Sequence, residues 1–165
     1  MHHEQAQRSF EIITSSKEAV LDLTPPVTIL NKLTTSIEAI HRGAKDGELD
    51  GAPVLSDWFL ANQGFPYFSG FGQGHPRLPD GIVYTSMALF IAPDLSHART
   101  LSRWYRLGKM KLPDAKGPEH DFIPTLDIEA LPAFLEEMTK SVHQAAYDYG
   151  RHDIVDRIKE VWMAK

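Results

Sequence analysis

Basic and aromatic side chains alternate in the stretch ARTLSRWYRLGKMK, residues 98–111, which has the strongest chemical character in the chain. Arginine donates paired hydrogen bonds to carboxylates and phosphates, and aromatic rings supply rigid contact area for proteins and nucleic-acid bases. We predict a partner-binding surface made of Arg77, Arg99, Arg103, Trp104, Arg106 and Lys109. A second interpretation stays open, in which the arginines pair with acidic helices of the same chain while Trp104 or Tyr105 joins the core.

Glycine is concentrated in GFGQGHPRLPDG, residues 70–81, between two apolar runs. Such a segment binds phosphate when free backbone N–H groups line a concavity, ideally at a helix N-terminus. Here the third glycine of the dinucleotide-binding pattern and the Lys-Ser/Thr pair of a P-loop are missing, and a strand is predicted to follow. The Pro-Asp-Gly sequence at 79–81 is typical of a tight turn. We therefore interpret the segment as a scaffold that shapes the sheet, with His75, Asp80 and Ser86 as a candidate polar turn site.

Patterns that would indicate an enzyme or a metal site are weak in this sequence. It has no cysteine, no H-E-x-x-H metal motif and no G-x-S-x-G or S-x-x-K nucleophile motif. Tyr105 and Lys109 have the Y-x-x-x-K spacing of short-chain dehydrogenases. Those enzymes need a βαβ nucleotide-binding fold, which this sequence does not predict, so we interpret the match as chance. The enzyme hypothesis that stays open is a small hydrolase-like activity using His75 with Ser86 or Asp94. We favour a non-enzymatic protein, with no catalytic residue, no cofactor and no metal.

Charge is distributed unevenly along the chain, whose net charge is -5. Residues 1–64 carry five Lys and Arg against nine Asp and Glu, residues 65–116 seven against three, and residues 117–165 five against ten. A basic centre between acidic ends indicates either an anion-facing patch or complementary packing among the three parts. Because nucleic-acid-binding domains are usually basic overall, the acidic total favours a protein partner.

The elements that position these residues predict an α+β fold in a single domain, residues 1–165. Residues 1–64 read as helical, with Leu30, Leu33 and Ile37 on one face of a helix that Gly43 ends. Residues 65–116 form the β-rich basic centre, and a small antiparallel β-meander is expected over about 65–108. Within it, a helical turn near 94–98 and a strand ending at Gly108 are favoured, with a helix over 95–107 as the alternative.

The last third, residues 117–165, is predicted to be helical again. A stripe of apolar residues marks one helix ending near Gly150, and Asp153 is expected to cap a terminal helix. These helices and the N-terminal ones would pack against the meander.

The composition predicts a cytoplasmic location. The chain has no cysteine, its N-terminus shows no secretory signal pattern, and its longest strictly apolar run, MALFIA, is far shorter than the ~20 residues that span a bilayer. No membrane association is expected, and His2 and His3 are given no role.

The central block GHPRLPDGIVYTS, followed by ARTLSRWYRLG, resembles the core of small bacterial proteins of unknown function from alphaproteobacteria and their plasmids or prophages. The resemblance covers residues 74–108, about a quarter of the chain, and it includes Gly74, His75, Pro76, Arg77, Asp80, Gly81, Thr85, Ser86, Arg99, Thr100, Ser102, Tyr105, Leu107 and Gly108. It implies a compact β unit and a mobile-element setting, and it carries no activity.

We therefore expect a non-enzymatic binding or regulatory protein that engages a protein or nucleoprotein partner through a basic-aromatic β surface. The mobile-element setting suggests an inhibitor of host or phage machinery. A direct DNA- or RNA-binding module is the further alternative, and homodimerisation stays open.

Overall fold

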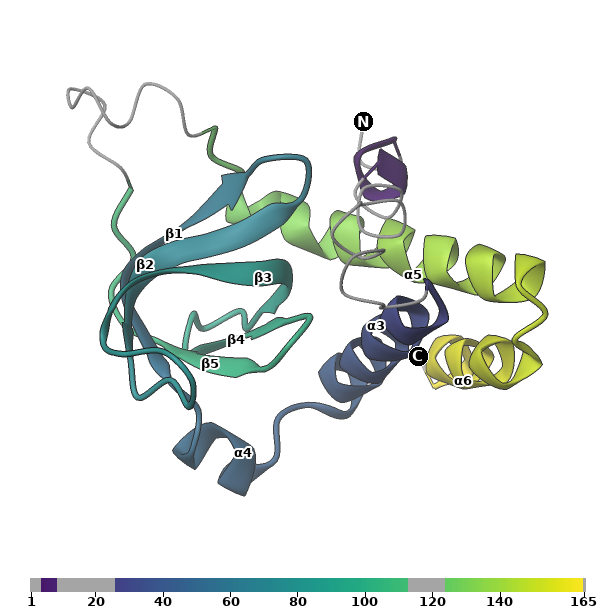
Figure 1. Ribbon diagram of the computed structural model, residues 1–165, viewed down its shortest axis with the longest axis horizontal. Helices are drawn as coiled ribbons and strands as arrows, with labels where there is room; N and C mark the ends of the chain where they lie inside the picture. The colour runs from purple at the N-terminus through teal and green to yellow at the C-terminus, as the bar shows by residue number, and fades with distance from the viewer. Residues whose placement is uncertain (1–3, 9–25, 113–123, 165) are drawn as a thin grey trace. The chain divides into compact units, whose positions relative to one another are not determined.

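The computed structural model describes residues 4–8, 26–112 and 124–164 (Figure 1). The chain divides into two compact units, which are Met1–Gly43 with Pro132–Lys165, and Ala44–Leu131. The first unit is helical and the second contains the strands, so the predicted α+β class is confirmed. The single-domain organisation stays a prediction.

The helical unit contains helices α3 (Pro26–Arg42), α5 (Leu131–Asp148) and α6 (His152–Met163). The stripe predicted for α3 is fully buried at Leu30, Leu33 and Ile37. Helices α3 and α6 contact each other, and Arg157 of α6 forms an ion pair with Glu38 of α3. Asp153 does not cap α6: Arg151 occupies the N-cap position, and Asp153 lies in the first turn, where it binds the Arg151 guanidinium. None of the described helices has the length and apolarity needed to cross a bilayer.

The β unit is a closed five-stranded barrel (Figure 1). Its strands are β1 (Val54–Asn62), β2 (Pro66–Gln73), β3 (Gly81–Ile91), β4 (His97–Thr100) and β5 (Trp104–Leu107). Consecutive strands pair antiparallel, and a parallel pairing of β1 with β5 closes the barrel. The short helix α4 (Asp46–Asp50) precedes β1, and a 3-10 helix, η1 (Ile128–Ala130), precedes α5.

Strand β1 corrects the prediction that residues 1–64 are helical and that the strands begin near residue 65. The alternation that marks a strand is absent from β1, because its residues 58–61 are all buried. Its pairing with β2 also shifts register between Ser56 and Phe59, where Asp57 has a φ of 49°. Such a bulge places consecutive side chains off the period of two on which the sequence prediction depends.

The segment after β3 also differs from its prediction. Neither the helical turn near 94–98 nor the alternative helix over 95–107 forms. Instead a turn around Leu95, whose φ is 60°, leads into β4, and β4 and β5 pair as a hairpin. Strand β5 ends at Leu107, one residue before the predicted end at Gly108.

Candidate functional site

One groove of the β unit brings together three of the predicted partner-binding residues. Its volume is about 250 Å³, and it is lined by Glu48, Gly51, Ala52, Pro53, Pro76, Arg99, Ser102, Arg103 and Trp104. We call it the basic groove, because two arginines line it against one glutamate. The wall formed by Glu48, Gly51, Ala52 and Pro53 was not among the site residues predicted from the sequence.

The turn between β4 and β5 fixes one side of the basic groove. The Thr100 hydroxyl oxygen accepts hydrogen bonds from the backbone N–H groups of Ser102 (3.2 Å) and Arg103 (3.3 Å). The Thr100 N–H donates to the Arg103 carbonyl oxygen at 3.0 Å. The hydroxyls of Ser86 and Ser102 lie 2.9 Å apart, which ties the turn to β3. Because these bonds define the turn backbone, Arg103 projects from a fixed base.

Trp104 forms a buried part of the groove lining. Its side chain is buried, with 4% of its surface exposed, and its ring packs against Phe90 and His97. The guanidinium carbon of Arg99 lies 5.5 Å from the centroid of the Trp104 ring, a distance typical of a cation–π contact. Trp104 therefore positions Arg99, and contact between Trp104 itself and a partner stays a prediction.

The other three predicted residues lie outside the lining of the basic groove. Arg106 donates from Nε (3.1 Å) and Nη2 (2.9 Å) to the carbonyl oxygen of Ala52, so it braces the groove wall. Arg77 is exposed on the loop beside Pro76, and Lys109 is exposed after β5. Their role as partner contacts stays a prediction.

The glycine-rich loop is held by its own side chains. Gly74 has a φ of +74°, and its N–H donates to Asp80 Oδ1 at 3.1 Å. The Nδ1 atom of His75 accepts hydrogen bonds from the N–H groups of Arg77 (3.0 Å) and Leu78 (3.1 Å). This arrangement supports the scaffold interpretation of the loop, since its polar side chains satisfy loop backbone groups.

The hydrolase-like alternative gains no support from this geometry. Ser86 meets Ser102, and Asp94 accepts from the N–H and hydroxyl of Ser96. Within the described part of the chain, no hydrogen bond joins His75 to Ser86 or to Asp94. A search of the same residues finds no group of three His, Asp or Glu side chains placed to hold a metal ion.

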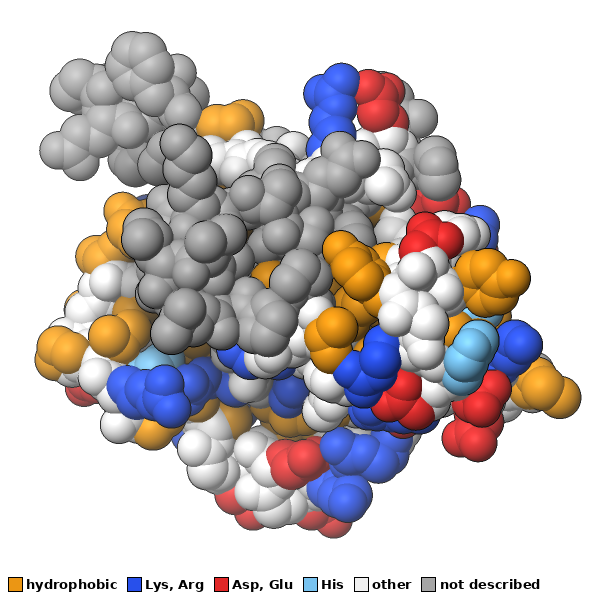
Figure 2. Space-filling view, turned by 45° about the vertical axis from the view of Figure 1, so that its right-hand side comes forward, with side chains coloured by type: hydrophobic (Ala, Val, Ile, Leu, Met, Phe, Trp, Pro, Cys, Tyr) orange, Lys and Arg blue, Asp and Glu red, His pale blue; other side chains and the backbone are white. Residues whose placement is uncertain are grey.

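The surroundings of the glycine-rich loop are electropositive. Burial lowers the pKa of His75, and the positive charges of Arg103 and Arg77 lower it further. Among the residues that the structure describes, neither Arg77 nor Arg103 forms an ion pair with a carboxylate. Figure 2 shows that Lys and Arg side chains gather in patches on the face that it draws. An anionic group approaching this loop therefore meets the positive charges of Arg77 and Arg103.

The lowered pKa of His75 predicts that acid weakens the β unit. Because the folded state favours the neutral ring, its stabilising effect is complete above the unfolded pKa of about 6.5. It is lost as the pH falls from there through the lower folded pKa, where protonation removes the Nδ1 acceptor. We expect His75→Asn, whose amide oxygen can accept the same loop bonds without titrating, to have a flatter dependence of unfolding free energy on pH between 7.5 and 5.5. Equal slopes for both proteins in urea titrations would contradict this.

These features define a small α+β protein in which a closed barrel carries a basic groove. The chain belongs to the Family of unknown function (DUF6634), whose model matches residues 23–118. That match includes α3 and the whole barrel, and it confirms that the chain belongs to an uncharacterised family. The link to alphaproteobacteria and mobile elements stays a prediction. No curated protein and no solved structure matches the chain.

Proposed function

We propose that this protein is a non-enzymatic binding protein whose basic groove takes an acidic segment of a partner protein. The observation that carries the proposal is Arg103, a half-buried arginine that lines the groove beside Arg99 and has no carboxylate partner among the described residues. A guanidinium in this position is a ready donor for a carboxylate.

Two physical effects favour binding at this groove. A partly buried charge is screened less by water than an exposed one, so a carboxylate beside Arg103 gains more electrostatic energy. The Thr100 hydrogen bonds and the contact of Arg99 with Trp104 hold the groove side before binding, which reduces the entropy lost when the partner docks.

A protein segment suits the basic groove better than a nucleic acid. The net charge of the whole chain is -5, whereas domains that bind nucleic acid are usually basic overall. Pro53, Pro76 and Ala52 add apolar walls that suit the side chains flanking an acidic residue. A nucleoprotein partner, an inhibitory role and a cytoplasmic location remain further predictions.

The test compares two variants that each remove one positive charge. A fluorescent decaglutamate peptide is titrated with the full chain at about 0.1 M salt and followed by anisotropy. We expect Arg103→Gln to weaken binding about tenfold, because it removes the donor in the groove. Lys111→Gln, which removes an exposed charge outside both the groove lining and the predicted partner-binding set, should change affinity less than about twofold.

A duplex of about 20 base pairs serves as the second probe. Tighter binding of the duplex than of the peptide, with a steep salt dependence that Arg103→Gln reduces, would replace the protein-partner proposal with direct nucleic-acid binding. Equal weakening by the two variants would show that general charge, and not the groove, attracts the peptide. Circular dichroism establishes that both variants fold.

A further inference from the structure

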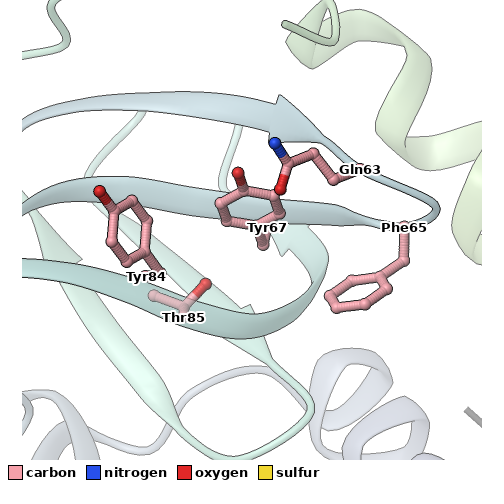
Figure 3. A pocket seen from close by; sticks show the side chains of 5 residues that line it. All are labelled: Gln63, Phe65, Tyr67, Tyr84 and Thr85. Carbon is pink, nitrogen blue, oxygen red and sulfur yellow. The ribbon is translucent and has the colours of Figure 1, made fainter. Parts of the chain in front are cut away.

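A second pocket, in the same β unit, is lined mainly by aromatic rings (Figure 3). Its lining residues are Gln63, Phe65, Tyr67, Tyr84 and Thr85, and its volume is about 370 Å³. Phe65 lies in the β1–β2 connection, Tyr67 on β2 and Tyr84 on β3. We call it the aromatic pocket; it shares no lining residue with the basic groove.

The three rings form angled walls. The ring centroids of Phe65 and Tyr67 lie 6.2 Å apart with an interplanar angle of 63°. Those of Tyr67 and Tyr84 lie 6.3 Å apart at 69°. Because neighbouring rings meet edge to face, the pocket is lined by both the faces and the edges of aromatic rings, and it is open on the Tyr84 side. Such walls suit a compact, rounded group better than an extended chain.

Two of the three rings, those of Tyr67 and Phe65, are held in place before any ligand binds. Tyr67 pairs with Ala61 of β1 and is buried with Phe59 and Ala61, and Phe65 packs against this cluster. The Thr85 hydroxyl accepts from the Phe68 N–H at 2.9 Å and donates to the Ser86 carbonyl oxygen, which fixes the irregular pairing of β2 with β3 beside the pocket. Tyr84 forms the open side, with 65% of its surface exposed. A preformed pocket binds with little loss of side-chain entropy.

We propose that the aromatic pocket binds a trimethylammonium group, presented as a trimethylated lysine side chain of a partner protein. The face of an aromatic ring carries negative electrostatic potential and attracts a cation within about 6 Å of its centroid. None of the five lining residues is charged, so the attraction comes from the rings and not from an ion pair.

Methylation is what suits the cation to this pocket. An unmodified lysine ammonium carries three N–H donors that are strongly hydrated and must find acceptors when they leave water. A trimethylammonium group keeps the charge, has no N–H to satisfy and adds apolar surface for the rings. A tyrosine phenol, whose ordinary pKa is about 10, is neutral at physiological pH, and burial together with nearby Tyr84 raises the pKa of Tyr67 further. Recognition then depends on ring faces.

The neighbouring surface favours a protein-borne group over a free small molecule. Ile82 of β3 pairs with Phe71 of β2 two residues along from Tyr84, and both are exposed, Ile82 to 68% and Phe71 to 38%. An apolar strip of this kind beside the pocket can contact residues that flank a modified lysine, whereas choline would leave it uncovered.

The experiment titrates the full chain with a short peptide that carries one trimethyllysine, followed by the NMR signals of the tyrosine rings. We expect this peptide to bind about tenfold more tightly than the same peptide with unmodified lysine or with a neutral tert-butyl isostere of the trimethylammonium group. Choline is the comparison for the free small molecule, and it should bind more weakly than the trimethyllysine peptide.

Variants of Tyr84 distinguish a contribution of its ring to binding from an effect on folding, because the side chain is largely exposed. Tyr84→Leu should weaken binding about tenfold, whereas Tyr84→Phe, which keeps the ring, should stay within about threefold. The control is Tyr147→Leu, which makes the same chemical change at a similarly exposed tyrosine on α5, outside the pocket lining. It should leave the affinity unchanged.

Several outcomes would overturn the proposal. Absence of saturable ring shifts with the trimethyllysine peptide would remove it, and equal affinity for the neutral isostere would show an apolar site without cation recognition. Stronger binding of choline would identify a small-molecule site, and preferential binding of a proline-rich peptide would identify an aromatic groove of another kind. The aromatic pocket does not include Arg103, so Arg103→Gln should leave binding of the trimethyllysine peptide unchanged. The two proposals can therefore fail independently of each other.

Discussion

Replacing Phe68 by alanine is expected to lower the free energy of unfolding of the β unit by about 3–5 kcal/mol. The Phe68 side chain is fully buried in the barrel, and its ring meets that of Trp58 edge to face, with centroids 5.7 Å apart. Truncation removes this contact and leaves a cavity that the closed barrel can fill only in part, because five paired strands restrict how far the wall can collapse. Urea titration followed by circular dichroism measures the loss.

Phe71→Ala is the matched control for Phe68→Ala. It makes the same chemical change on the same strand, but 38% of the Phe71 surface is already exposed. Less area returns to water and no enclosed cavity forms, so its cost should be less than half that of Phe68→Ala. Similar losses for the two variants would contradict the assignment of Phe68 to the barrel core.

Helix α3 shows what periodicity predicts well. Leu30, Leu33 and Ile37 recur at helical spacing, and burial of one face decides their placement whatever surrounds the helix. Strands β2 and β3 were also predicted in outline, because turn residues separate apolar, aromatic-rich runs. In both cases the signal is local.

Barrel closure was not predictable by the same reasoning. It depends on β1 pairing with β5, with Val54 opposite Arg106 and Leu55 opposite Leu107, across about fifty residues of chain. The bulge at Asp57 removes the alternation that would have marked β1 as a strand. The β4–β5 turn was missed because its Thr100 hydroxyl bonds replace the glycine or proline that usually signals a turn.

The candidate site was predicted in part. The sequence identifies Arg99 and Arg103 by residue type, and the structure brings both to one groove. It gives no sign that Arg106 is engaged by Ala52, a backbone acceptor 54 residues away. The aromatic pocket was missed for a different reason: Phe65, Tyr67 and Tyr84 also favour strands, so the sequence attributes them to the fold alone.

Replacing Gly70 by alanine is expected to destabilise the β unit by about 1–3 kcal/mol, although the change adds a single methyl group. A Cβ at this position would lie 2.9 Å from the Ser56 carbonyl oxygen and 3.0 Å from the Trp58 Cα. Both are backbone atoms on either side of the β1 bulge, so relief requires β1 itself to move and not only a side chain to rotate. Differential scanning calorimetry of the full chain measures the effect.

The control, Gly47→Ala, lies in α4, where an added Cβ meets nothing within 4 Å. Because alanine favours helix over glycine, this variant should be unchanged or more stable by up to about 1 kcal/mol. Opposite signs for the two substitutions would show that Gly70 is required by the close approach of β1 and β2. Equal stability of the Gly70→Ala variant and the original protein would mean that the two strands lie further apart than the structure places them. The position of Trp58 depends on the same close approach. Its Nε1 donates to the Gly108 carbonyl oxygen at 3.0 Å, and strands lying further apart would also displace this hydrogen bond.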